Sequence, residues 1–160
     1  MPGYYDAIDF KWDDNGDYLI GKDGDFAITD TDTISSLSTE IKTIIASDTG
    51  DWEMYRSLAA DLKDFIGEPN IREVGKRIED RIKNSIVLSR LVESSDIKVR
   101  VTPLTHDSLM IIVIISATST VTNSLETNGQ LTIPFIFDMA AGGITFKPAA
   151  PKTNYFPVKE

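Results

Sequence analysis

The chain of 160 residues contains no cysteine and a single histidine, His106. Without cysteine there are no disulfides, thiol nucleophiles or thiolate metal ligands, and the chain suits a reducing compartment or one where crosslinks are not needed. A zinc site would have to be built from one histidine and carboxylates, which is a poor ligand set. His106 is followed by Asp107 and Ser108, but neighbours on a turn do not form a catalytic triad, whose members meet through the fold. We therefore interpret His106 as a surface turn residue.

Long apolar runs are also missing. The longest, residues 109–115, is about a third of the ~20 residues that a membrane helix needs, so no transmembrane span is expected. The acidic N-terminus has no basic and apolar segments of the kind that form a signal peptide. Apolar residues nevertheless make up 41% of the chain, enough for one domain that buries roughly 70% of its unfolded surface.

Basic residues are few, because 16 Lys and Arg stand against 25 Asp and Glu. The excess is concentrated in residues 1–32, which contain nine acidic and two basic side chains and so account for -7 of the net charge of -9. This balance argues against nucleic-acid binding, which depends on Lys and Arg at phosphates. Two interpretations stay open for the acidic segment: a solvated surface, or an electrostatic docking patch for a basic partner.

The N-terminal segment, residues 1–24, is predicted to be an acidic arm of short strands and turns without an internal repeat. Asn15-Gly16 and Asp23-Gly24 lie between apolar pairs, as in tight hairpin turns. A calcium loop starting at Asp13 would need Gly where the chain has Tyr18 and a bidentate Glu where it has Gly24, so we favour turns over a metal site.

Helical spacing of apolar residues recurs three times. We predict helices over residues 33–47, over about 52–66 with an end at Gly67, and from Pro69 to about residue 88. The third helix carries many charges of both signs on its polar side, which is typical of a solvated surface.

Strand patterns dominate the second half. Residues 97–103 alternate apolar and polar, and residues 109–117 form a continuous apolar run that is typical of a strand covered on both faces, so the two are predicted to pair as a hairpin. Residues 130–137 form a third candidate strand, in which Pro134 indicates an edge or a bulge. The expected fold is therefore α+β, with about three helices on a small, mostly antiparallel sheet.

The boundaries that follow are an arm at 1–24, a main domain at 25–117, an additional strand and loop at 118–146, and an extended, proline-rich tail at 147–160. Tyr155 and Phe156 in the tail could anchor it on a neighbour or on the domain's own core. The Gly-rich residues 140–143 lack the Lys and the strand-to-helix context of a phosphate-binding loop.

One short motif, Gly67-Glu68-Pro69-Asn70, lies between the second and third predicted helices. Gly67 can end one helix and Pro69 can open the next. Glu68 has two interpretations. It can accept backbone N–H groups at the start of the third helix, or it can act with Asp61 or Asp64 as a carboxylate pair in glycoside hydrolysis, for which the sequence builds no cleft.

The order of elements over residues 24–117 resembles the baseplate wedge, or sheath-initiator, family of contractile phage tails. The resemblance is carried by a Gly-Asp-Phe-Ala-Ile-Thr-Asp strand entry, a helix ending in Phe-x-Gly-Glu-Pro-Asn, a long amphipathic helix and a closing β-hairpin. In that family a Glu-Pro pair occupies this helix junction, and here it would be Glu68-Pro69-Asn70. Relatives occur in type VI secretion baseplates, and a stress anti-adapter shares the domain.

The resemblance implies a structural virion protein, present in several copies in the tail baseplate and assembled in the host cytoplasm, rather than an enzyme. Its partners would be wedge proteins and the tail sheath protein, with tube or hub proteins as further neighbours, and neither a cofactor, a metal, nucleic acid nor a membrane is expected. The sheath would add strands to an exposed sheet edge. The residues expected to contact partners are Glu68, Pro69, Asn70, Lys98, Arg100, Ile112 and Ile114. The alternatives are a lysozyme-like enzyme that uses Glu68 and a cytoplasmic anti-adapter-type binding module.

Overall fold

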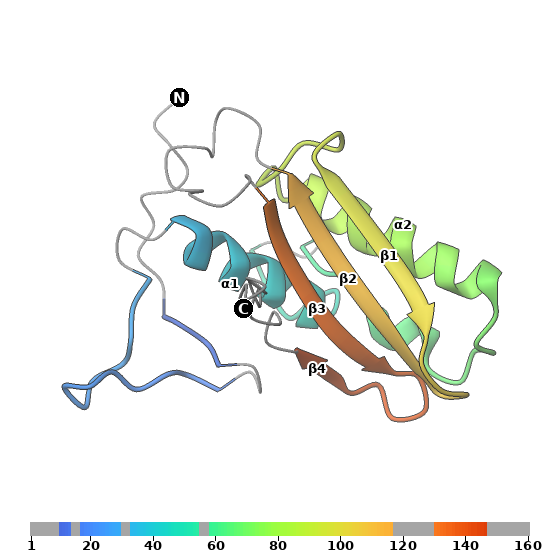
Figure 1. Cartoon of the computed structure of the whole chain (residues 1–160), viewed down its shortest axis with the longest axis horizontal. Coiled ribbons are helices and arrows are strands. Elements are labelled where there is room, and N and C mark those ends of the chain that lie inside the picture. The colour runs from blue at the N-terminus through green and yellow to red at the C-terminus, as the bar shows by residue number, and fades with distance from the viewer. Residues whose placement is uncertain (1–9, 14–16, 30–32, 55–57, 117–129, 147–160) are drawn as a thin grey trace, which may run out of the picture.

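The computed structural model describes residues 10–13, 17–29, 33–54, 58–116 and 130–146. Residues 10–13 and 17–29, here called the arm, lie to one side of the remaining residues, here called the body (Figure 1). In the body, two α-helices pack against one face of a four-stranded antiparallel sheet. The predicted α+β class is confirmed, but the prediction of about three helices is wrong. A search of the described residues found no helix with the length and apolarity needed to cross a membrane.

The sheet has the strand order β1-β2-β3-β4, in which every neighbour pair is antiparallel. Its strands are β1 (Ile97–Pro103), β2 (Ser108–Ser116), β3 (Gln130–Asp138) and β4 (Ile144–Phe146). The predicted hairpin is confirmed as β1 and β2, and the third predicted strand is β3. Strand β4 was not predicted, because three residues are too few to show a period of two.

The helices α1 (Thr33–Ala46) and α2 (Arg72–Leu88) lie behind the sheet in Figure 1. They form where predicted, and their apolar stripes are buried against the odd-numbered residues of β1 to β3. The resulting core is built mainly from isoleucine, leucine and phenylalanine. Its largest fully buried side chains include Ile41, Ile45, Phe65, Ile78, Ile82, Ile86, Ile111, Phe135 and Phe137.

The helix predicted over residues 52–66 is absent from the described part of that segment, where only η1 (Leu62–Phe65), a single 3-10 turn, is helical. The backbone of residues 59 and 60 bonds to other elements instead. Ala60 N–H donates to the Ile44 carbonyl at the end of α1 over 3.0 Å, and the Ala59 carbonyl accepts from Ser85 Oγ on α2 over 2.7 Å. An extended segment between two helices therefore buries apolar residues whose spacing resembles that of a helix.

Asp61 interrupts any helix in this segment. Its backbone is left-handed, with φ at 49°, and its carboxylate accepts from the Thr49 backbone N–H and from Thr49 Oγ1. Trp52 also turns back, donating from its ring nitrogen to Ser47 Oγ over 2.9 Å. These bonds hold the described residues 47–54 and 58–61 in a non-helical arrangement, which outweighs the local helical pattern.

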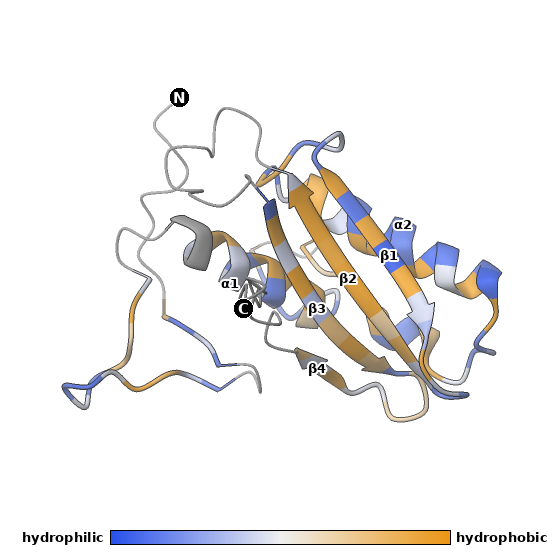
Figure 2. Cartoon of the chain, in the orientation of Figure 1, coloured by the Kyte–Doolittle hydropathy of each residue, from blue (hydrophilic) through white to orange (hydrophobic). Residues whose placement is uncertain are grey.

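In the part of the chain that the structure describes, helices cover one face of the sheet. The other, here called the free face, carries the even-numbered residues of β1 to β3, and its apolar members Met110, Ile112 and Ile114 are only partly buried. Figure 2 shows β2 as an orange band for most of its length on this side. The prediction that β2 is covered on both faces is therefore wrong for the described chain: no described helix lies over the free face.

Pro134 of β3 has a clear position. It lies opposite Ile112 of β2, one residue outside the stretch 135–137 that pairs with β4. Asp138 N–H donates to Gly143, on the β4 side, while Met139 N–H donates to Asp107, on the β2 side. Because backbone N–H directions alternate along a strand, the nitrogen of Pro134 points away from β2, as that of Asp138 does. The proline therefore removes no hydrogen bond to β2.

The arm is a closed triangle of three short extended segments. Lys11 N–H donates to Ala27, Leu19 N–H donates to Lys11, and Ala27 N–H donates to Leu19, over 2.8 to 2.9 Å. Antiparallel bridges join the same three segments in pairs, Phe10 with Ile28, Trp12 with Tyr18, and Ile20 with Phe26.

This triangle corresponds to an eight-residue sequence repeat, so the expectation of no internal repeat is wrong. The three copies are DFKWDDNG at 9–16, DYLIGKDG at 17–24 and DFAITDTD at 25–32. The three N–H donors of the triangle, residues 11, 19 and 27, occupy one repeat position, and the aromatic residues 10, 18 and 26 occupy another. Divergence at the other positions hides the repeat, since mainly the leading Asp and the aromatic residue are shared by all three copies.

Candidate functional site

The junction formed by residues 67–70 is tied to the sheet at both ends. Gly67, whose φ of 79° suits glycine, donates its N–H to the Met139 carbonyl beyond β3 over 2.9 Å. Asn70 Nδ2 donates to the Thr105 carbonyl in the β1–β2 turn over 2.8 Å. The exposed Pro69 lies between these two attachments, so the segment is held as a fixed surface feature.

Glu68 does not cap α2. The N-cap position is Ile71, which makes no side-chain capping bond, and Glu68 Oε2 instead accepts from Arg77 Nη1 over 2.7 Å. The interpretation of Glu68 as a carboxylate that accepts backbone N–H groups at the helix start is therefore wrong. The guanidinium of Arg77 reaches this carboxylate because the side chain projects from α2 toward the preceding turn.

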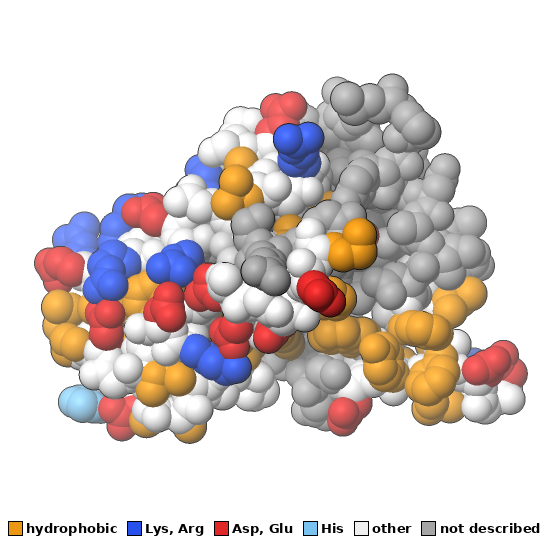
Figure 3. Space-filling view, turned by 180° about the vertical axis from the view of Figure 1, so that it is seen from behind, with side chains coloured by type: hydrophobic (Ala, Val, Ile, Leu, Met, Phe, Trp, Pro, Cys, Tyr) orange, Lys and Arg blue, Asp and Glu red, His pale blue; other side chains and the backbone are white. Residues whose placement is uncertain are grey.

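Arg77 and Arg81 lie on the back of the molecule, beside the ring of Phe65 and the carboxylates of the preceding loop. The guanidinium groups of Arg77 and Arg81 lie 5.2 and 5.9 Å from the centre of the Phe65 ring. Arg81 also contacts the carboxylates of Asp61 and Asp64, each at 3.3 Å. All three carboxylates that the hydrolytic interpretation would use are thus ion-paired with arginines of α2. Blue and red side chains alternate over this region in Figure 3.

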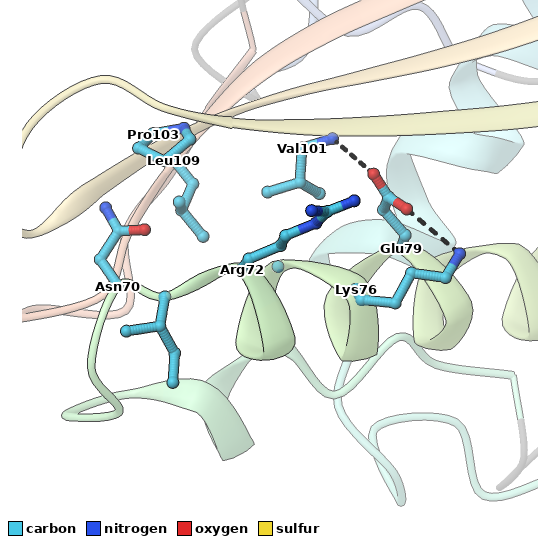
Figure 4. A pocket seen from close by; sticks show the side chains of 9 residues that line it. Asn70, Arg72, Lys76, Glu79, Val101, Pro103 and Leu109 are labelled. Atoms are coloured by element: carbon cyan, nitrogen blue, oxygen red, sulfur yellow. Dashed lines mark hydrogen bonds and ion pairs between the residues drawn. The ribbon is translucent and has the colours of Figure 1, made fainter.

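A groove of about 430 Å³ lies between the start of α2 and the outer edge of β1 (Figure 4). Gly75 keeps its α2 side open, and apolar side chains of β1 and β2 face it. Lys76 and Glu79 pair with each other at its rim, 3.3 Å apart. The lining residues are Asn70, Ile71, Arg72, Gly75, Lys76, Glu79, Val101, Pro103 and Leu109.

Glu79 also closes part of the outer edge of β1. Its Oε1 accepts from the Val101 backbone N–H over 3.1 Å (Figure 4). At both ends of the hairpin, the backbone N–H groups of even-numbered residues point toward the neighbouring strand. Leu104 N–H donates to the Ser108 carbonyl, and Ser116 N–H donates to the Asp96 carbonyl. The N–H groups of odd-numbered residues of β1 therefore face outward.

Two outward N–H groups of β1 have no acceptor in the described chain, those of Ile97 and Val99. Val101 is bonded to Glu79, and Pro103 has no N–H to offer. A side-chain acceptor and a proline are devices that limit strand pairing at an edge. The outer edge of β1 is consequently closed at residues 101–103 and open at residues 97–99.

The seven predicted partner-binding residues fall into two separate groups. Glu68, Pro69 and Asn70 lie together at the junction. Lys98, Arg100, Ile112 and Ile114 have even numbers on β1 and β2 and lie together on the free face, where Lys98 is opposite Ile114 and Arg100 is opposite Ile112. The second group therefore belongs to a sheet face and not to a strand edge.

The residues that organise the site were not all identified from the sequence. Arg77 and Arg81 are spaced by four on α2, which predicts one shared helix face but not their partners in the preceding loop. The helical spacing places Glu79 on the polar side of the predicted third helix and gives no further role to it. No sequence pattern connects it to the backbone of Val101, because that contact depends on how α2 crosses the sheet.

Two lysines at the surface titrate above their ordinary range. The hydrogen bond with Asp48 raises the pKa of Lys63, and the hydrogen bonds with Asp80 and Glu79 raise the pKa of Lys76. A raised lysine pKa stabilises the fold at pH values below the ordinary 10.5 and loses this effect as pH rises through the folded value. Neither lysine therefore makes stability depend on pH near neutrality.

His106 lies at the exposed turn between β1 and β2, as predicted, with Nδ1 2.6 Å from the Asp107 carboxylate. Ser108 Oγ is bonded instead to Thr105 Oγ1 over 2.6 Å.

Comparison of the chain with protein-family models, with curated proteins and with solved structures found no match. The resemblance to the sheath-initiator family thus stays a prediction from the sequence.

Proposed function

We propose that the chain is a structural component of the baseplate of a contractile phage tail or related injection system, where it contacts wedge subunits and initiates the sheath. The proposal starts from the order of elements and the Glu-Pro junction in the sequence. The observation that carries it further is the outer edge of β1. This edge offers the N–H groups of Ile97 and Val99 to an added strand and is closed by Glu79 and Pro103 beyond them.

An edge that is open at one end and closed at the other suits strand addition in a defined register. A partner strand can take up the N–H of Val99 and end where Glu79 occupies Val101. Backbone bonds then supply the attachment, while the closed end limits uncontrolled pairing with other chains.

The Glu68-Pro69-Asn70 junction is proposed as the contact with wedge subunits. Its bonds to Arg77 and Thr105 fix its position before any partner binds, so little conformational freedom is lost on association. Glu68 thus acts through the shape of the junction and through its ion pair, not as an acid.

Strand addition is tested with Val99→Pro, compared with Val99→Ala. Both variants lose the half-buried valine side chain, but only proline also removes the outward N–H. The N–H of residue 99 does not donate to β2, so its removal leaves the pairing of β1 with β2 in place. With the tail sheath protein that the proposal gives as the partner, we expect sheath initiation, counted by electron microscopy, to fail for Val99→Pro and to persist for Val99→Ala. Sheaths of normal number and length from a folded Val99→Pro protein would contradict the proposal.

The junction is tested with Glu68→Ala, compared with Glu73→Ala on the exposed first turn of α2. The first change releases Arg77 from the junction, whereas the second leaves it in place. We expect Glu68→Ala to stay folded and to lose copurification with wedge proteins, and Glu73→Ala to retain it. Equal recovery of wedge proteins by both variants would exclude the junction as their contact.

A further inference from the structure

The arm exposes an apolar face that is rich in aromatic side chains. Within each extended segment, residues two apart point to the same side, which places Phe10, Trp12, Tyr18, Ile20, Phe26 and Ile28 on one face. Three of the rings contact one another at 5.4 to 5.6 Å, yet Tyr18 stays 54% exposed and Ile20 56%. Figure 3 shows orange side chains gathered at the arm. Such a face is typical of a protein interaction surface.

The free face of the sheet is a second apolar surface, and its apolar side chains are only partly buried. Met110, Ile112 and Ile114 of β2 lie beside Pro134 and Ile136 of β3 and form one stripe. The continuous apolar sequence of β2 is of the kind found in strands covered on both sides, but the described chain covers only one side. Among the described residues, the stripe therefore stays partly exposed.

The charges around the two surfaces are opposite. The exposed Asp17, Asp23 and Asp25 belong to the arm, which lies in the segment that carries most of the net negative charge of the sequence. Lys98 and Arg100 border the apolar stripe along β1, and neither forms an ion pair with any described residue. An arm that combines an apolar face with exposed aspartates thus exists on the same chain as an apolar stripe with a basic border.

We propose that the arm of one copy binds the free face of a second copy, with the aromatic residues over the β2 and β3 stripe and the aspartates beside Lys98 and Arg100. The contact joins two different surfaces, so it is heterologous, and each bound pair still offers one arm and one free face. Association therefore continues into a ring or a chain of copies. The inference does not depend on the proposed baseplate function and uses neither the junction nor the edge of β1.

The test uses two full-length variants, each lacking one surface. The arm variant is Ile20→Ser with Asp25→Lys, and the face variant is Arg100→Glu with Ile112→Thr. In sedimentation velocity over a concentration series, we expect the wild type to associate, and each variant alone to associate at least about tenfold more weakly. Leu88→Ser, which removes an apolar side chain that is 66% exposed on α2, is the matched control and should associate as the wild type does.

Mixing the two variants separates this arrangement from other modes of association. The face variant retains its arm and the arm variant retains its free face, so the mixture should form a one-to-one dimer that cannot grow. Circular dichroism of each variant establishes that it is folded. A wild type that is monomeric at all concentrations, including one whose arm binds its own free face, would overturn the inference. A mixture that forms no dimer would overturn it as well.

Discussion

The arm and the body place their apolar residues in opposite ways. In the body, Ile41, Ile78 and Phe135 are fully buried between the helices and the sheet. In the arm, Phe10 and Phe26 remain 44% and 49% exposed although their rings touch. Both regions are rich in β-branched and aromatic residues, so composition alone does not distinguish them. The difference is that, among the described residues, the helices and the sheet of the body pack against each other, whereas no second layer packs on the arm.

This contrast indicates two separate sources of order. The body is stabilised by burial of a common core, at about 25 cal/mol for each Å² of apolar surface removed from water. The arm is held by a cycle of backbone hydrogen bonds and by ring contacts at the surface, whose net contributions are small. The arm is therefore the region whose order can depend on a partner, while the body can fold without one.

The largest predicted effect comes from a matched pair of phenylalanines. Phe135→Ala opens a cavity in the core and should lower the free energy of unfolding by about 3–5 kcal/mol. Phe26→Ala should change it by less than about 0.5 kcal/mol, because the ring is half exposed in the arm. Urea unfolding of dilute protein, followed by circular dichroism, measures both values. Similar losses for the two variants would show that arm and body form one cooperative unit.

Glu79→Ala should destabilise the body and open the outer edge of β1. It leaves the Val101 N–H without its acceptor, at a cost of about 1–3 kcal/mol, and it opens the edge of β1 to other chains. We expect a lower urea midpoint together with increased aggregation by light scattering. Glu79→Gln is the control, since its carbonyl oxygen can still accept this bond. A Glu79→Ala protein as stable and as soluble as the wild type would remove the edge-closing role.

Gly24→Ala should weaken the arm alone. Gly24 has a φ of 86°, which costs an alanine roughly 1–2 kcal/mol. We expect faster amide hydrogen exchange in residues 17–29 and an unchanged unfolding transition of the body. Gly21→Ala is not a suitable control, because its Cβ would lie 2.6 Å from an Asp23 oxygen. Slower or unchanged exchange in the arm would show that the left-handed turn does not hold it.

Gly75→Ala should have the smallest effect and the opposite sign. A Cβ at this position of α2 would lie 3.5 Å from Val101 Cγ1, an ordinary contact, and alanine favours the helix. We expect the body to gain about 0.5–1 kcal/mol in the free energy of unfolding, with exchange in the arm unchanged. A destabilised variant would mean that the groove beside β1 does not have room for a methyl group.

The sequence predicted the elements in which one periodicity extends over many residues. Helices α1 and α2 and strands β1 to β3 form where the spacing indicates, because their apolar faces all turn toward one core. The helix predicted at 52–66 failed for a physical reason. Ala59, Leu62 and Phe65 are buried in an extended loop and a 3-10 turn, and the backbone of the loop at residues 59 and 60 bonds to α2 and α1.

The candidate site was predictable only in part. Glu68 and Pro69 were identified as a junction, but the partner of Glu68 is Arg77, nine residues further on, and local sequence gives no reason to choose it over neighbouring cations. The bond from Val101 to Glu79 is likewise a property of tertiary packing. The arm repeat lay in the sequence, but only the cyclic hydrogen bonds of residues 11, 19 and 27 make its period evident.

The most direct test of the contrast between arm and body is amide hydrogen exchange of the wild-type chain at two concentrations, one below and one above the onset of association. We expect exchange in residues 17–29 to slow several-fold at the higher concentration, while exchange in α2, on the opposite side of the sheet, stays the same. Equal exchange rates in the arm at both concentrations, with associated protein present, would contradict the claim that the arm's apolar face is covered by a second copy.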